Sequence, residues 1–281
     1  MTRLHRGHES ALRYCGQINA AGVRAVEDLI SDTDIALVIT SFGGELDSPV
    51  RLAELVAARG LDVEVVGPCF SGCAAFVFIA GNRRVVTSAG ILGFHNTASS
   101  AALLGLRSLD DDAPSGFAPI LARASREWQL YLTKGVGFSL LYEPQVRIDT
   151  ICTRPRGTHS VSGERVIDIL SALDFWLPAP GTLGEAGIIF EGSLPATERD
   201  AAHRFQAYMP SSVPVPKFTA DNKRLARSPE AHLYPIPVCP EPLRSGKTPP
   251  AAAQSFDPVP APPDEEPRKL RSREDASAPS D

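Results

Sequence analysis

The sequence lacks the long apolar runs and single-sign charge blocks that direct proteins to membranes or to polyanions. Among its 281 residues, no stretch reaches the ~18 apolar residues that a membrane span requires. The N-terminus has no apolar core of an export signal. A net charge of −5 without a Lys or Arg cluster argues against nucleic-acid binding. As written, the sequence predicts a cytoplasmic protein, and export would require a true start that lies upstream.

Cysteine is also scarce, with five residues scattered over the chain. This odd number argues against a dense disulfide framework. Cys69 and Cys73 form the one close pair, and their spacing fits neither a zinc knuckle nor a Cys-x-x-Cys redox motif. Two interpretations stay open, namely small buried side chains at a helix start or a disulfide or redox pair. We expect no metal and no cofactor.

What the sequence does contain, in its N-terminal part, is an alternation of short apolar runs and amphipathic segments. Residues 35–39 are continuously apolar, which is typical of a strand covered on both faces. The alternation predicts an α/β fold with a mostly parallel sheet, whose functional residues lie at the carboxyl ends of strands. The predicted strands are 12–16, 35–39, 63–66, 85–86 and 91–92, and the predicted helices are 20–30, 48–58 and 74–80.

The remainder of the chain is less regular. The pattern predicts a loop or lid at 96–116, helices at 117–134, 139–148 and 166–173, a polar turn at 154–159, an extended segment at 173–177 and a helical turn at 182–186. Sixteen of the 25 prolines follow Met209, a density that prevents regular structure. We therefore expect one domain over 1–208 and a disordered proline-rich tail over 209–281.

Ser71 is the candidate nucleophile, because it follows the strand at 63–66 in a turn of small residues and precedes an apolar helix. Free N–H groups at a helix start favour negative charge. His95 follows the strand at 91–92 and is the candidate base. Gly43 and Gly44, after the strand at 35–39, and Gly72 are candidate oxyanion donors. The alternatives are a helix cap, an ordinary histidine and turn glycines.

Together these motifs resemble the Clp protease proteolytic-subunit family, within the ClpP/crotonase superfamily, and most of all its exported Clp-like relatives. The matching segments, within residues 12–192, are Ile-Thr-Ser-Phe-Gly-Gly at 39–44, Gly-x-x-x-Ser-Gly at 67–72, Ala-Gly-Asn-Arg-Arg at 80–84 and Gly-Phe-His at 93–95. The resemblance implies a repeated β-β-α/βαβ spiral, a serine peptidase acting on peptide or protein substrates, and a homo-oligomer.

The resemblance also assigns residues. It implies a triad of Ser71, His95 and Asp174, with Gly43, Gly44 and Gly72 forming the oxyanion hole. Asp174 is assigned because 173–177 and 183–189 look like the family's aspartate and closing segments. Asp149 and Asp168 lie in the same span and are alternatives for the acid.

The sequence departs from the family pattern at three places. Phe42 stands where the family has proline. An insertion at about 96–160 falls where Clp subunits have the handle that joins their rings, so a double ring is not expected. Eleven residues precede the first predicted strand, too few for loops that meet an ATPase partner.

Two other functions stay open on these grounds. The long insertion and the uncertain acid fit an inactive Clp-like oligomeric binding module. A crotonase-type acyl-CoA enzyme has similar strand-end glycines, but the pairing of a serine with a histidine counts against it.

Overall fold

The structure, a computed structural model, describes residues 1–6, 9–44, 47–102, 117–148, 150–158, 165–171 and 173–221. These residues belong to one compact unit, Met1–Lys247. Its elements are β1 (Thr2–Arg6), β2 (Glu9–Cys15), α1 (Ala20–Leu29), β3 (Asp34–Ser41), α2 (Ser48–Arg59), β4 (Asp62–Phe70), η1 (Cys73–Phe78), β5 (Arg84–Val86), β6 (Ile91–Gly93), α4 (Phe117–Lys134), α5 (Ser139–Arg147), β7 (Thr150–Thr158), β8 (Arg165–Ser171), β9 (Phe175–Leu177), α6 (Pro180–Glu185), β10 (Glu191–Gly192), α7 (Glu198–Tyr208) and β11 (Phe218–Ala220).

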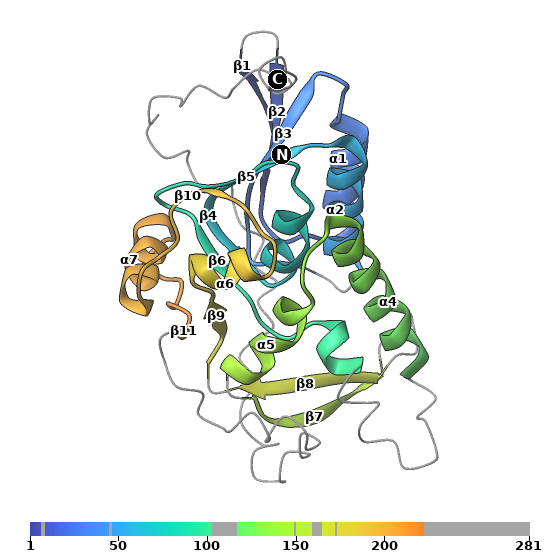
Figure 1. Cartoon of the computed structure of the whole chain (residues 1–281), viewed down its shortest axis with the longest axis vertical. Coiled ribbons are helices and arrows are strands. Elements are labelled where there is room, and N and C mark those ends of the chain that lie inside the picture. The colour runs from blue at the N-terminus through green and yellow to red at the C-terminus, as the bar shows by residue number, and fades with distance from the viewer. Residues whose placement is uncertain are drawn as a thin grey trace, which may run out of the picture. The chain divides into compact units, whose positions relative to one another are not determined.

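The central element is a seven-stranded sheet in the order β1-β2-β3-β4-β5-β10, with β6 pairing β4 beyond the end of β5 (Figure 1). All pairs except β1–β2 are parallel. Helices α1, α2 and η1 provide the crossovers between successive parallel strands, as a parallel sheet requires. The fold is therefore α/β with a mostly parallel sheet, as the apolar pattern predicted.

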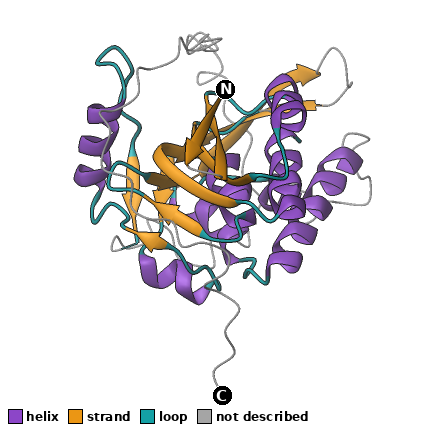
Figure 2. Cartoon of the chain, turned by 90° about the horizontal axis from the view of Figure 1, so that it is seen from above, coloured by secondary structure: helices purple, strands orange, loops and turns teal. Residues whose placement is uncertain are grey.

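Apolar side chains fill both faces of this sheet, and Figure 2 shows helices on both sides of the strands. In β4, Val63 and Val65 point into the larger core beneath α1, α2 and η1. Phe70, at the end of the same strand, belongs to a second, aromatic cluster beneath α7. Because successive strand residues face opposite sides, β4 connects the two cores.

Strand β4 is longer than the pattern predicted, and this difference concerns the candidate nucleophile. The strand continues through Gly67 to Phe70, because Pro68 to Phe70 pair with Ile91 to Gly93 of β6. Gly67 is required there because a side chain would collide with the ring of Tyr208. The turn therefore shrinks to Ser71 and Gly72.

Several sequence-based expectations about secondary structure are wrong. Residues 166–173 were expected to be helical, but 165–171 form β8, which pairs antiparallel with β7. The expected turn at 154–159 lies largely within β7. Both segments contain β-branched residues, and their pairing favours strands over the helical spacing. The first strand was expected at 12–16, but Thr2–Arg6 already form β1 and the next strand, β2, begins at Glu9.

The fold also continues past residue 208, where the domain was expected to end. Phe218–Ala220 form β11, which pairs parallel with β9, and Phe218 is buried in the aromatic cluster. Residues 222–281 lie outside the described residues, so the expected disorder of the tail stays a prediction. In the expected loop at 96–116, residues 98–102 are helical and 103–116 are not described.

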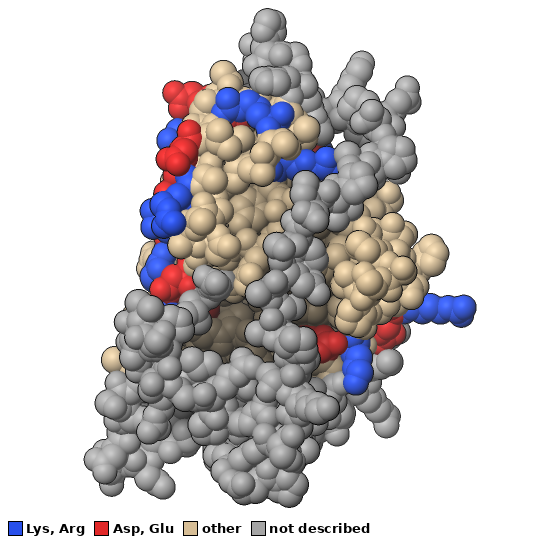
Figure 3. All heavy atoms as spheres, turned by 180° about the vertical axis from the view of Figure 1, so that it is seen from behind, with Lys and Arg blue, Asp and Glu red and all other residues tan. Residues whose placement is uncertain are grey.

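Charged side chains of both signs alternate along one edge of the face in Figure 3. Ion pairs of this kind join α1, α2 and α4, including Arg51 with Glu27 and Arg126 with Glu54. These pairs are exposed, so each contributes little to stability. Among the described residues, no helix is both long and apolar enough to cross a bilayer.

Candidate active site

Ser71 occupies the turn between β4 and η1. Its φ is +56°, in the left-handed region that residues with a side chain rarely adopt. Two hydrogen bonds fix this conformation: the Ser71 N–H donates to the Gly93 carbonyl at 2.9 Å, and the Ser71 carbonyl accepts from the Ala75 N–H at 2.8 Å. The turn leaves Ser71 half-exposed in an otherwise buried segment.

The sheet brings His95 to Ser71. Phe70 and Gly93 are partners in the β4–β6 register, so the residues that follow them emerge at the same sheet edge. The distance from His95 Nε2 to Ser71 Oγ is 2.5 Å. A hydroxyl hydrogen-bonded to an imidazole in this way can pass its proton to the imidazole when the oxygen attacks an electrophile.

His95 is half-buried, and the edge of its ring lies against Phe175 with the ring centres 5.5 Å apart. Burial lowers the pKa of His95 to about 4, and the charge of Asp174 acts in the opposite direction. The imidazole is therefore neutral at pH 7, which is the form that accepts a proton.

Gly43 lies beside Ser71 and could not carry a side chain. Its φ is +93°, and an added Cβ would stand 2.6 Å from Ser71 Cβ. The Gly43 N–H does not point freely into the site, because it donates to Ser41 Oγ at 3.0 Å, and the same hydroxyl donates to the Gly43 carbonyl at 3.1 Å. The expected donor is thus close to Ser71 but already has an acceptor.

The other two candidate donors differ from Gly43. Gly44 forms a bridge with Ile18, whose carbonyl would be 1.7 Å from an added Cβ. Gly72 is buried against Pro49 directly after Ser71. Within the described part of the chain, neither the Gly44 nor the Gly72 N–H donates a hydrogen bond.

Asp174 is less closely tied to the pair. Its side chain is exposed just before β9, and its Oδ2 accepts a hydrogen bond from the Lys217 N–H at 2.7 Å. In the described residues no hydrogen bond joins it to His95, on which it acts through its charge. Of the alternatives, Asp149 lies outside the described residues, and only the backbone of Asp168 is described, within β8.

The two cysteines beside the serine form a disulfide, which resolves the interpretations that the sequence left open. Cys69, in β4, is bonded to Cys73, the first residue of η1, with the Cα atoms 5.2 Å apart. Both residues are fully buried. Among the described residues, no three His, Cys, Asp or Glu side chains gather as a metal site would require.

Two residues near the site are not among those predicted from the sequence. Ser41 holds the Gly43 backbone through a Ser turn, which a serine two residues before a strand-end glycine could have indicated. Asp221 accepts hydrogen bonds from Trp176 Nε1 at 2.7 Å and from the Ala179 N–H at 2.6 Å. It lies in the segment expected to be a tail, so no sequence signal pointed to it.

Comparison with known proteins gives little further guidance. No protein-family model and no curated protein matches the chain. Among solved structures, a ClpP1 mutant from Listeria monocytogenes is similar over 68% of this chain and 94% of its own, with 13% sequence identity and a TM-score of 0.38. A similarity at this level says nothing about activity.

Proposed function

We propose that this protein is a serine hydrolase that cleaves peptide bonds, with Ser71 as nucleophile and His95 as general base. One observation carries the proposal, namely the 2.5 Å contact between Ser71 Oγ and His95 Nε2 at the carboxyl edge of the sheet. The left-handed turn at Ser71 supports it, because strained backbone at a residue with a polar side chain is common at functional sites.

In the proposed reaction, neutral His95 takes the proton of Ser71 as Oγ attacks the substrate carbonyl carbon. The carbonyl oxygen becomes an oxyanion, for which the Gly72 N–H is the adjacent donor. The Gly43 N–H joins it once it leaves Ser41 Oγ. His95 then returns the proton to the leaving amine as the C–N bond breaks, and water hydrolyses the acyl-enzyme by the same steps in reverse.

Asp174 completes the proposed site as the residue that stabilises the imidazolium. Its negative charge raises the pKa of His95 against the effect of burial, which is the direction that a base needs when it takes a proton. We propose that Asp174 acts on His95 through its charge and not through a hydrogen bond. Gly44 has a supporting role, because its contact with Ile18 fixes the turn that carries Gly43.

We extend the proposal to relationship and assembly. The motifs at 39–44, 67–72, 80–84 and 93–95 support a Clp-like hydrolase that forms homo-oligomers. Light scattering during size-exclusion chromatography tests the assembly, and elution at the mass of one 30.0 kDa chain contradicts it.

A catalytically inactive binding module is the second candidate. Two observations favour it: the Gly43 N–H already donates to Ser41, and Asp174 is exposed and accepts from Lys217. The serine and histidine would then be present, but one of the expected oxyanion donors is engaged and the acid is not hydrogen-bonded to the base. This candidate predicts a folded protein in which Ser71 has no unusual reactivity.

Labelling with a fluorophosphonate distinguishes the two, because this probe reacts with activated serines. We expect stoichiometric modification at Ser71, identified by peptide mass spectrometry, and none in Ser71→Ala. Ser125 is the matched control, since it is an exposed helix serine whose hydroxyl donates to the Leu121 carbonyl. Labelling should be unchanged in Ser125→Ala. Folded protein that is not labelled at Ser71 would contradict the hydrolase and favour the binding module.

A further inference from the structure

We propose that the Cys69–Cys73 disulfide is a positioning element for Ser71, so that opening the bridge lowers the reactivity of the serine while the protein stays folded. This inference rests on the proposed function. The sheet and helices around the two cysteines are already closely packed, so the fold does not depend on the bridge for its core. The bridge is therefore free to serve the site.

The first observation is where the bridge lies in the chain. It connects the end of β4 to the first residue of η1, and Ser71 is the middle one of the three residues between the two half-cystines. The bridge is the one covalent constraint on the turn beyond the chain itself, and none of the strand pairings depends on it directly. The turn is therefore the part of the fold on which the bridge acts most directly.

The second observation is the conformation that the turn must keep. Ser71 has a φ of +56°, which is unfavourable for a residue with a Cβ. A chain free to relax would move toward negative φ, and this rotation swings the Ser71 side chain. Because Oγ lies 2.5 Å from His95 Nε2, a small rotation breaks the contact. The closed ring of the disulfide restricts the rotation.

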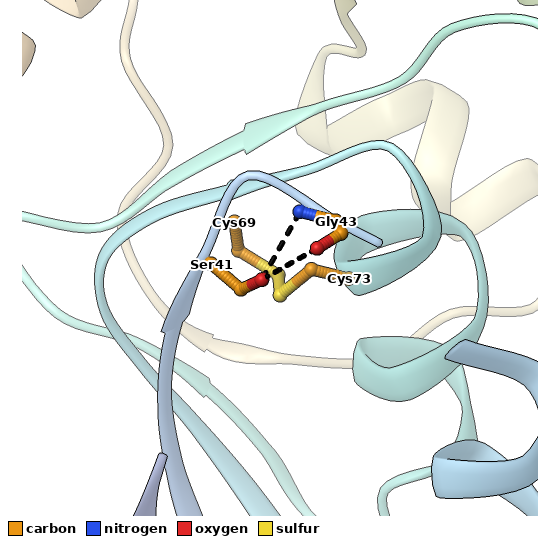
Figure 4. Close-up of a disulfide and its surroundings, with 4 residues drawn as sticks. All are labelled: Ser41, Gly43, Cys69 and Cys73. Carbon is orange, nitrogen blue, oxygen red and sulfur yellow. Dashed lines mark hydrogen bonds between the residues drawn. A yellow bond between two sulfur atoms is a disulfide. The ribbon is translucent and has the colours of Figure 1, made fainter. Parts of the chain in front are cut away.

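The third observation connects the bridge to the oxyanion side of the site. Ser41 and Cys69 are partners in the β3–β4 register, and Figure 4 shows the disulfide directly beside the Ser41 side chain that bonds both ends of Gly43. The disulfide is therefore adjacent both to the turn that carries Ser71 and to the turn that carries Gly43. Opening it is expected to loosen both turns together.

The chemistry of opening is a two-electron reduction. A dithiol supplies two electrons and two protons, its two sulfurs form a new disulfide, and the Cys69–Cys73 S–S bond breaks to give two thiols. Both cysteines are buried, so the exchange requires transient opening of the turn and should be slow in the native protein. Reoxidation reverses it.

The test uses the full-length chain with Cys15, Cys152 and Cys239 replaced by alanine, so that only the bridged pair remains. Labelling of Ser71 by a fluorophosphonate is timed before and after treatment with a dithiol, and mass spectrometry counts the free thiols. We expect labelling about 10- to 100-fold slower once two thiols are present, since a displacement of about 1 Å at a reacting group costs that much. Reoxidation should restore the rate.

Two further measurements separate positioning from general stabilisation. Circular dichroism must show the same folded protein in the oxidised and reduced forms. The labelling rate should depend on pH through the protonation of His95 in the oxidised form, and this pH dependence should be absent in the reduced form. The variant Cys69→Ala/Cys73→Ala should match the reduced form and not respond to the dithiol.

The outcomes are distinct. Unchanged labelling with two free thiols overturns this inference, and so does a loss of labelling that occurs only together with unfolding. Absence of labelling in the oxidised protein contradicts the proposed function instead.

Discussion

The nucleophile end of the candidate site and its acid end are built in different ways. Ser71 and His95 follow two adjacent parallel strands, β4 and β6, whose register places them together within a continuous sheet. Asp174 precedes β9, whose backbone pairs with the main sheet, within the described residues, at one bridge between Phe94 and Trp176. The first arrangement is fixed by many hydrogen bonds and the second by few. Positioning is therefore expected to be tight at the serine and loose at the acid.

This difference suggests that the Ser71–His95 pair contributes more to the proposed catalysis than Asp174 does. Ser71 lies within the loop that the disulfide closes, packs against the Gly43 turn, and donates its N–H to the Gly93 carbonyl. Asp174 exchanges hydrogen bonds with the backbone of Lys217, and its side chain is exposed. A charge in that position still acts on His95 but is screened by water and salt.

The largest expected effect is at the base. His95→Ala should slow labelling of Ser71 by about 10³-fold, since it removes general-base catalysis, whereas Asp174→Ala should cost only about tenfold, one pKa unit or so of charge stabilisation. Rates of fluorophosphonate labelling measure both. If the two substitutions cost the same, Asp174 is a full triad member and the contrast between the two ends is wrong.

The next effect concerns the glycine beside the nucleophile. Gly43→Ala should slow labelling by about 100-fold, because the new Cβ must displace Ser71. Gly135→Ala is the matched control. Gly135 also has a positive φ, +64°, but an added Cβ there meets no atom within 4 Å. It should lose about 1 kcal/mol of stability in thermal unfolding and keep its labelling rate. If Gly43→Ala and Gly135→Ala slowed labelling equally, backbone strain and not the collision with Ser71 would explain the loss.

The pH dependence of labelling tests the environment of the base. With the pKa of His95 at about 4, the imidazole is neutral at pH 7 and becomes protonated only as the pH falls through about 4. The labelling rate should therefore decline near pH 4, not near the ~6.5 of an ordinary histidine. Asp174→Asn removes the charge that raises this pKa, so the midpoint should move to still lower pH. A midpoint near 6.5 would show that His95 is not desolvated.

The attachment of β9 can be weakened without touching the site. Asp221→Ala leaves the indole N–H of Trp176 and the N–H of Ala179 without their acceptor, which should cost about 2–4 kcal/mol in the free energy of unfolding. Asp32→Ala is the control, because its ion pair with Arg59 is exposed and worth about 0.5 kcal/mol or less. Denaturant titration compares them. Equal stabilities would mean that the segment after residue 208 is not part of the cooperative fold.

The smallest effect is expected at Ser41. Ser41→Ala frees the Gly43 N–H, and a hydrogen bond of about 0.5–1.5 kcal/mol then no longer competes with the oxyanion. Labelling should become a few-fold faster. A slower rate would mean instead that the Ser41 hydroxyl holds Gly43 in the conformation that the reaction requires.

Most of the first hundred residues could be predicted from the sequence, because the strands there are buried on both faces and bounded by clear helix signals. Gly60 ends α2 in the left-handed conformation that a helix end favours, and Pro49 lies in its first turn. Ser71 and His95 could be expected at one edge of the sheet because each follows a predicted strand. Their exact contact depends on the register of β4 and β6, which no local pattern encodes.

The C-terminal half was harder to predict for a physical reason. Residues 165–171 have apolar side chains at spacings that fit a helix, and only their pairing with β7 decides between the two. Similarly, Phe218 lies among prolines and is buried only because the aromatic cluster of Phe70 and Phe205 receives it. Long-range contacts of this kind cannot be read from composition.

The left-handed backbone at Ser71 has a consequence for the stability of the protein. Glycine is the one residue that adopts such a φ without cost, so Ser71→Gly should fold more stably than the natural chain, by roughly 1 kcal/mol, while losing its hydroxyl. If the hydroxyl had no use, glycine would be the better residue here. Keeping a serine at this position sacrifices stability, and the melting temperature of this one variant measures how much the protein gives up for its reactive group.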